Sequence, residues 1–321
     1  MISVIMIVYN VEPYVRQGIT SVLAQTYTDL EVIVVVGHGS DRSESICEEL
    51  AAADPRIKLI CGEAKGIADA RNQGLAAATG EYIGFVDPDD YVEPDMFERM
   101  LAGIKAHDAD ISVCGRFYEY VNRTLADEPA EPVVLSAGEA LSVTLSHKGF
   151  FLHCWDKLFA RHLFDGIRFD TSVVVEDRII VDRLLANANR IVYDPTPLYH
   201  FRERSGSNSK KSGMISNNIE ADRMMEDFFK KEFPALSNEL GRFMLYEYIT
   251  AIQNELCAPH PGAEALAEYK KGVRAFLSKD NPLIPQMFRI KAYMALYTPA
   301  VLKLYTKYHL KKVSEELERF S

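Results

Sequence analysis

The sequence predicts an α/β protein in which a mostly parallel sheet is flanked by helices and followed by a helical C-terminal region. Apolar, β-rich runs alternate with amphipathic segments about every 25 to 30 residues, which is typical of βαβ units. The chain has 321 residues, of which 48% are hydrophobic. This is enough for one large α/β domain and a smaller appendage.

Four strands and four helices are expected in the first third of the chain. Ser3 to Tyr9 and Glu31 to Val36 are apolar runs, as expected of strands buried on both faces. Ile67 to Ala78 has helical spacing, and Gly80 follows it as a helix-ending residue. The other predicted elements are strands at Ile57 to Cys61 and Tyr82 to Val86, and helices at Pro13 to Gln25, Asp41 to Ala53 and Pro94 to Ala106.

The later segments are less regular. Residues 121–136 are polar and contain Pro and Glu, which predicts a loop or insertion. We expect Gly138 to Ala188 to return to the sheet and to cover the functional site of the protein. From about residue 215 the sequence is mostly helical, with breaks near Pro259–Pro261 and Pro282–Pro285. We therefore expect two domains, 1–212 and 213–321.

Composition excludes several classes of protein. The net charge of -10 argues against a general nucleic-acid binder. The five cysteines are scattered without a CxxC pair, which predicts free thiols in a reducing compartment. The sequence contains no run of about 18 apolar residues, so we expect no membrane-spanning helix. The N-terminus lacks a basic leader, so we expect a buried first strand and no signal peptide.

The strongest local signal is the acidic turn Asp87-Pro88-Asp89-Asp90 after a buried strand. Ligands on parallel sheets bind at the carboxyl ends of strands, here the segments after Val8, Val36 and Val86. Three carboxylates in four residues repel one another unless a cation balances them. Their oxygens suit Mg²⁺ or Mn²⁺. A turn that caps the next helix is the alternative, and the strand-end position favours the metal.

Two further segments are less specific. Glu176 and Asp177 precede an amphipathic helix, and either could act as a general base. An acidic pair there also complements the helix dipole, and taken alone this explanation is preferred. Arg202 and Arg204 lie in a Ser/Gly-rich stretch that suits phosphate oxygens or, alternatively, a solvated loop.

Together, these segments resemble a known family. The chain is similar to family 2 glycosyltransferases with a GT-A fold, of the bacterial surface-polysaccharide type, from residue 1 to about 210. Several motifs in the same order make this resemblance more specific than any single one. The matching stretches are Ser3 to Asn10, Ser21 to Tyr27, Ala70 to Leu75, Ala78 to Tyr82, Phe85 to Tyr91, Trp155 to Phe159 and Glu176-Asp177.

The resemblance implies an inverting, metal-dependent transfer of a sugar from a nucleotide-diphosphate sugar, in particular a UDP-sugar, to a hydroxyl of a saccharide or lipid-linked acceptor. It implies a GT-A domain at 1–212, with a donor side (1–115) and an acceptor side (138–212). By position, Asp177 is the base with Glu176 beside it. The resemblance places Asp87, Asp89 and Asp90 at Mn²⁺ or Mg²⁺. It places Tyr9, Asn10, Arg71, Asp87, Arg202 and Arg204 at the donor. On the acceptor side it places Trp155 and Lys157. Core packing is an equal alternative for Trp155, the one tryptophan.

The chain departs from the family after the second strand, where Asp-Asp-Gly-Ser is usual. The matching residues are Val36-Gly37-His38-Gly39, followed by Ser40 and Asp41. In the family an acid of this pair commonly reads the uracil ring, so its loss leaves the donor base open. His38, Asp41 or backbone groups are the candidate substitutes. The same departure supports a second hypothesis, that the protein is a non-catalytic relative that binds nucleotide-sugars or a partner enzyme. The presence of Asp87, Asp89 and Glu176-Asp177 favours the enzyme.

The C-terminal region has an unusual charge pattern. Residues 281–314 contain no acidic residue although the whole chain is acidic. Basic residues attract anionic lipid and aromatic residues settle at the membrane interface. Our hypothesis is a peripheral membrane anchor that brings a cytoplasmic protein to the inner face of the cell membrane. The alternative is a helical pair packed on the rest of the protein. The basic residues are Arg289, Lys291, Lys303, Lys307, Lys311 and Lys312.

Overall fold

The computed structural model describes residues 1–321 except 63, 174, 204–213, 260, 279 and 320–321, and the side chains of 214–218 and 310–319. The chain forms two compact units. The first comprises residues 1–141 and 149–204, and the second comprises residues 142–148 and 205–321. The expected domain boundary at residue 212 stays a prediction, because it falls in a segment that the structure does not describe.

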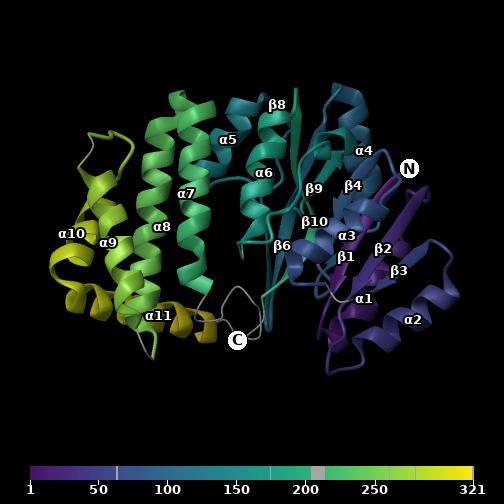
Figure 1. The fold of residues 1–321 in the computed structure, drawn as a ribbon, viewed down its shortest axis with the longest axis horizontal. Coiled ribbons are helices and arrows are strands. Elements are labelled where there is room, and N and C mark those ends of the chain that lie inside the picture. The colour runs from purple at the N-terminus through teal and green to yellow at the C-terminus, as the bar shows by residue number, and fades with distance from the viewer. Residues whose placement is uncertain (63, 174, 204–213, 260, 279, 320–321) are drawn as a thin grey trace. The chain divides into compact units, whose positions relative to one another are not determined.

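The first unit is built on one ten-stranded mixed sheet with helices on both faces (Figure 1). Its strands are β1 Ile2–Val8, β2 Leu30–Val36, β3 Ile57–Cys61, β4 Tyr82–Phe85, β5 Tyr91–Val92, β6 Ile111–Tyr120, β7 Arg123–Ala126, β8 Val133–Leu135, β9 Lys157–Ala160 and β10 Ile191–Arg202. Its helices are α1 Glu12–Leu23, α2 Ser43–Ala53, α3 Ile67–Ala77, α4 Met96–His107, α5 Ala137–Leu145 (whose end belongs to the second unit) and α6 Glu176–Asn187.

The strand order is β3-β2-β1-β4-β9-β6-β10-β5, with β7 beside β6 and β8 beside β10. Strands β1 to β4 run parallel, as predicted. Strand β9 runs antiparallel to both β4 and β6 and therefore joins this parallel set to the parallel pair β6 and β10. The second half of the sheet is thus mixed, which the helix–strand alternation did not predict.

The side chains of β1 alternate between two helical layers. Val4, Met6 and Val8 pack into a core with apolar residues of α1, α2 and α4. Ile5 faces α3, where a Cβ on Gly74 would lie 2.5 Å from its Cγ2, so a glycine allows this helix to approach closely. Burial on both faces explains the unbroken apolar run of this strand.

One segment differs from its prediction. Residues 121–136, expected to be a loop or insertion, contain β7 and β8, which pair with β6 and β10. The residues of β7 and β8 are mostly exposed. Short edge strands of this kind lack the buried apolar pattern from which strands are recognised.

The parallel register brings three strand ends to one edge of the sheet. Val8 pairs with Val36, and Ile5 pairs with Phe85, the last residue of β4. The segments that follow β1, β2 and β4 therefore leave the sheet as neighbours, as the sequence predicted for a ligand site.

The second unit is helical, as predicted, and α8 contacts all its other long helices. The predicted breaks near Pro259–Pro261 and Pro282–Pro285 separate α8 from α9 and α9 from α10. No described helix is both long and apolar enough to cross a bilayer. All five cysteines are free thiols, as expected. The helices are α7 Met214–Glu232, α8 Ser237–Cys257, α9 Ala263–Leu277, α10 Gln286–Tyr297 and α11 Pro299–Arg319.

Candidate functional site

The acidic turn that follows β4 is held in place by β10. The backbone N–H of Asp87 donates to the Tyr199 hydroxyl (3.1 Å), and this hydroxyl donates to Oδ2 of Asp90 (2.9 Å). The other oxygen of Asp90 accepts from the backbone N–H of Arg202 at 2.8 Å. Asp90 is buried and both its oxygens have protein donors. Asp90 therefore fixes the turn through these contacts, and its expected place at a metal stays a prediction.

Asp87 and Asp89 lie at the partly exposed side of this turn. Loss of solvation by the surrounding protein raises the pKa of Asp87 to about 6. The charge of Arg71 opposes this shift, and the charge of Asp89 adds to it. Arg71 is the nearest cation, with Nη2 3.8 Å from Oδ1 of Asp87. Neighbouring carboxylates repel each other, and a cation bound between them offsets this repulsion.

Arg71 of α3 connects the acidic turn with the start of α6. Its Nη1 donates to Oε1 of Glu176 at 2.7 Å, and its guanidinium lies over the rings of Phe85 and Phe169, 6.0 and 5.3 Å from their centroids. Burial raises the pKa of Glu176 to about 7, although the charge of Arg71 opposes this shift. Glu176 is thus occupied by Arg71, whereas contact of Arg71 with a donor stays a prediction.

Asp177 is the more accessible acid of the pair, with a side chain 22% exposed against 6% for Glu176. Its Oδ1 accepts from the backbone N–H of Arg178 at 2.8 Å, and its Oδ2 lies 3.6 Å from Nδ1 of His153. Burial alone would raise the pKa of Asp177, but the nearby His153 side chain and the charge of Arg71 lower it overall. Asp177 is therefore ionised at neutral pH, the form that a general base requires.

His153 is a site residue that the sequence did not indicate. Its side chain is 46% exposed, and its ring stacks on Trp155 with centroids 5.1 Å apart at an interplanar angle of 12°. Trp155 in turn stacks on Tyr199, the residue that holds the acidic turn, at 4.4 Å. The one available signal was the position of His153 two residues before Trp155.

Trp155 and Lys157 are both held by protein partners, and their expected contacts with an acceptor stay predictions. Trp155 is 6% exposed and belongs to the main core, so its packing alternative is preferred. Lys157 is fully buried, and its Nζ donates to the carbonyl oxygens of Phe151 (2.7 Å) and His153 (2.8 Å) and to Oδ1 of Asp156. Both residues therefore support the segment that carries His153.

On the opposite side of the acidic turn, the loops after β1 and β2 are joined to each other. Asn10 adopts a positive φ of 50° and its Oδ1 accepts from the backbone N–H of Ser40 at 2.8 Å. A Cβ on Gly39 would lie 2.3 Å from this oxygen, so the contact requires glycine. Tyr9 is 60% exposed beside this junction. The predicted donor contacts of Tyr9 and Asn10 are compatible with these positions and stay predictions.

The structure separates the candidates for the missing acid after β2. The Asp41 carboxylate accepts from the backbone N–H groups of Glu12 (2.9 Å) and Ser43 (3.0 Å), which occupies it at the starts of α1 and α2. The His38 side chain is 62% exposed, with Nδ1 3.1 Å from Glu44. His38 is therefore the more accessible candidate.

Arg202 is attached to protein oxygens on two elements. Its Nη1 donates to the Asp89 carbonyl at 2.8 Å, and its Nη2 donates to Oε1 of Gln17 at 2.6 Å. This arrangement restrains the backbone of the acidic turn. Its expected contact with a diphosphate stays a prediction. Arg204 lies outside the described residues.

The carboxylates of the turn fit a cation that is shared with a ligand. Among the described residues, no group of three or more His, Cys, Asp or Glu side chains is arranged to hold a metal by itself. Mg²⁺ is commonly held by one or two carboxylates together with substrate phosphates. Asp87 and Asp89 supply oxygen ligands of this kind.

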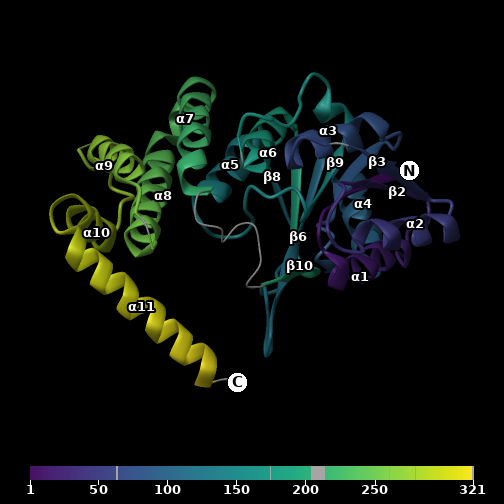
Figure 2. The same cartoon turned by 60° about the horizontal axis from the view of Figure 1, so that its bottom comes forward.

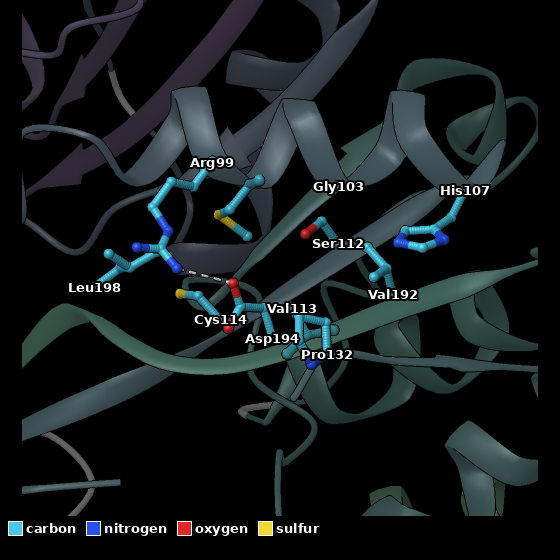
Figure 3. Close-up of a pocket in the computed structure, with 11 residues that line it drawn as sticks. Arg99, Gly103, His107, Ser112, Val113, Cys114, Pro132, Val192, Asp194 and Leu198 are labelled. Carbon is cyan, nitrogen blue, oxygen red and sulfur yellow. Dashed lines mark hydrogen bonds and ion pairs between the residues drawn. The ribbon is translucent and has the colours of Figure 1, made fainter. Parts of the chain in front are cut away.

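A small pocket lies elsewhere in the first unit, between α4 and strands β6 and β10 (Figure 3). Its lining includes Ser112, Cys114 and the Arg99–Asp194 ion pair (3.2 Å), but none of the predicted site residues. Its volume of about 60 Å³ is well below the roughly 300 Å³ of a typical ligand pocket. We assign no ligand to it.

Comparison with known proteins identifies the family. The family model described as "Glycosyl transferase family 2" matches residues 3–168, more than half of the chain. The chain therefore belongs to glycosyl transferase family 2. Glycosyltransferase GlyA of Streptococcus pneumoniae is 36% identical over 219 residues, which is 65% of this chain and 31% of GlyA. The uncharacterized glycosyltransferase EpsJ of Bacillus subtilis is 35% identical over 64% of this chain and 62% of EpsJ. The matched region thus spans between about a third and three fifths of these relatives.

Solved structures show the same fold. Residues 1–349 of S. aureus TarS in complex with UDP-GlcNAc give a TM-score of 0.71 at 19% identity, covering 98% of this chain and 91% of that chain. The mannosyltransferase PcManGT of Pyrobaculum calidifontis, in complex with GDP-Man and Mn²⁺, gives 0.54 at 20% identity over 95% of this chain and 87% of that chain. The fold is therefore GT-A, as the resemblance implied.

The buried position of Lys157 makes its structural role testable. Lys157→Met leaves the Asp156 carboxylate buried without its nearest cation, so we expect a loss of about 3–5 kcal/mol in the free energy of unfolding, measured by denaturant titration. The double variant Asp156→Asn/Lys157→Met should recover part of this loss. A Lys157→Met protein of unchanged stability that loses only acceptor affinity would support the acceptor role.

Proposed function

We propose that this protein is a metal-dependent, inverting glycosyltransferase that moves a sugar from a nucleotide-diphosphate sugar to an acceptor hydroxyl in polysaccharide or glycoconjugate synthesis. The observation that carries the proposal is the grouping of the Asp87/Asp89 turn and Asp177 around Arg71 at one edge of the sheet. The neighbouring structures with UDP-GlcNAc and with GDP-Man support a sugar nucleotide as the donor class.

The chemistry follows from the positions of the acids. Asp177 accepts the proton of the acceptor hydroxyl, whose oxygen forms a bond with the anomeric carbon while the bond from that carbon to the donor diphosphate breaks. One such displacement inverts the anomeric configuration. His153 and Arg71 keep Asp177 ionised before the reaction. Glu176 holds Arg71 and does not take the proton.

Asp87 and Asp89 are the residues that would hold Mn²⁺ or Mg²⁺. When bound, such an ion offsets the negative charge that develops on the departing diphosphate. Arg202, at the end of β10, is close enough to the turn to add a donor if it exchanges its contact with Gln17 for a phosphate oxygen.

The nucleobase is the finer part of the proposal. We favour a UDP-sugar, with Tyr9 beside the base and His38 in the position of the missing acid. An imidazole can donate as well as accept a hydrogen bond, whereas a carboxylate only accepts. This difference leaves room for another base, and it is also the feature that supports a non-catalytic nucleotide-sugar-binding protein as the second candidate.

We propose a saccharide or lipid-linked acceptor and a cytoplasmic location at the inner face of the membrane. The five free thiols agree with a reducing compartment. No role in nucleic-acid binding is proposed, because the net charge is -10.

Asp177→Asn should lower kcat at least about 10²-fold, because the amide does not accept the acceptor proton and general base catalysis contributes 10² to 10⁴. Release of the nucleoside diphosphate in the presence of acceptor measures this loss. Asp108→Asn is the matched control, since the Asp108 side chain is 99% exposed. Full turnover by Asp177→Asn would remove the proposed base. Donor binding without turnover in the wild-type protein would favour the non-catalytic candidate.

Donor and metal should bind together at the acidic turn. We expect Mn²⁺ with one class of nucleoside diphosphate to raise the melting temperature by several degrees, because a ligand of the folded state stabilises it by mass action. Asp89→Ala should lose this metal-dependent increase. Equal stabilisation with and without Mn²⁺ would argue against a shared cation. A panel of bases run in the same assay identifies the donor.

His153 should act as a positioning residue for Asp177. His153→Gln removes the imidazole, so the pKa of Asp177 should rise and the acid limb of the kcat/KM profile should move to higher pH. His153→Asn keeps a donor near the place of Nδ1 and should recover part of the shift. An unchanged pH profile in both variants, with only a loss of stability, would show a purely structural role.

A further inference from the structure

The exposed face of α10 is apolar, the reverse of the usual pattern. The helix buries Ala292 and Ala295. At 3.6 residues per turn, the opposite face is occupied by Met287, Ile290, Tyr293 and Tyr297, which are 53%, 45%, 56% and 70% exposed. A surface helix of a globular protein normally carries polar residues there.

The next helix repeats this arrangement. Helix α11 buries Leu302 and Thr306, and the Thr306 hydroxyl accepts from Nε2 of Gln253 on α8 at 2.8 Å. Its opposite face presents Val301, Leu304 and Tyr308, which are 51%, 69% and 70% exposed. Among the described side chains of α11, residues 299–309, the side that packs on the unit is thus partly polar, and the opposite side carries large apolar side chains.

The two helices are held together as one surface element. Both contact α8, and Nζ of Lys291 on α10 lies 5.3 Å from the ring centroid of Tyr305 on α11. Figure 2 shows α10 leading directly into the long α11 at the end of the chain. We call the exposed residues the C-terminal apolar face: Met287, Ile290, Tyr293, Tyr297, Val301, Leu304 and Tyr308.

Charge indicates what covers this face. Residues 281–314 include six Lys and Arg and no Asp or Glu, in a chain of net charge -10. On α11, Lys307 is exposed and Lys303 partly exposed, and both border Leu304. A second copy of the chain would bring the basic stretch 281–314 against the same stretch of its partner, since the acids of α11, Glu315, Glu316 and Glu318, follow only after it. Anionic lipid headgroups provide the complementary charge.

We propose that the C-terminal apolar face docks on the surface of an anionic bilayer. Its aliphatic side chains and tyrosines enter the headgroup–acyl boundary while the flanking lysines contact anionic headgroups. The helices lie in the interface plane, and none of the described helices has to span the bilayer. This face contains none of the residues proposed for sugar transfer.

Vesicle flotation of the full chain tests the proposal. The probes are vesicles of phosphatidylcholine alone and vesicles that also contain phosphatidylglycerol. One variant is Ile290→Ser/Tyr297→Ser/Leu304→Ser, and a second is Lys303→Ala/Lys307→Ala. The matched control is Val121→Ser/Leu125→Ser/Val133→Ser, which removes three exposed apolar side chains from the first unit. All substituted apolar residues are exposed, so folding should be retained, which circular dichroism checks.

We expect the wild-type protein and the control to float with phosphatidylglycerol vesicles. The triple serine variant should partition about tenfold or more weakly, and the alanine variant should bind more weakly and with less dependence on salt. Equal flotation of the wild-type protein and the triple variant, or no flotation of the wild-type protein, would overturn the proposal. Wild-type dimers that the triple variant loses in light scattering, without vesicle binding, would assign the face to self-association instead.

The proposal and the transfer reaction fail independently. Transfer to a water-soluble acceptor should be the same in the wild-type protein and in the triple variant. Loss of flotation with normal transfer concerns the membrane surface alone, and loss of transfer with normal flotation concerns the site.

Discussion

The site depends on one buried cation among several acids. Arg71 is 7% exposed, and it lies within 2.7 Å of Glu176 and 3.8 Å of Asp87, which come from different elements. Without this guanidinium the two carboxylates would repel each other, and the start of α6 would not be held beside the turn after β4. The rings of Phe85 and Phe169 fix the guanidinium in place. Glu176, Asp177 and Asp87 all act on the charge of Arg71, and a grouping of acids of this kind is suited to a divalent cation.

Several buried residues hold the more exposed residues of the site in position. Tyr199 joins the acidic turn to β10 and stacks on Trp155, and Trp155 supports His153 beside Asp177. Nζ of Lys157 donates a hydrogen bond to the backbone carbonyl of His153 and so fixes this part of the chain. Motif residues of this kind support the site, because a proton acceptor works only when its distance and orientation are maintained.

In the second unit, large apolar side chains are placed differently from those in the first. In the first unit, apolar runs are buried between two helical layers, whereas α10 and α11 turn their large apolar side chains outward. Exposed apolar surface is unfavourable in water unless something covers it. Residues 281–314 contain no acid, and our proposal of an anionic surface as the cover is based on this charge pattern.

The sequence by itself determined the parallel half of the sheet, the helical C-terminal region and the family, because these depend on local periodicity and on short motifs at strand ends. It also located the acids at Asp87, Asp89 and Asp177. Tertiary structure alone decided which of the neighbouring residues are held by protein partners. Asp90 and Lys157 are of residue types that bind ligands, but partners from segments distant in the sequence or from the local turn occupy them. His153 has no motif, and its place beside Asp177 arises from the packing of two segments that the sequence separates by more than twenty residues. The order of strands β9, β6 and β10 was equally hidden, since hydrogen bonds between distant segments leave no periodic trace in the chain.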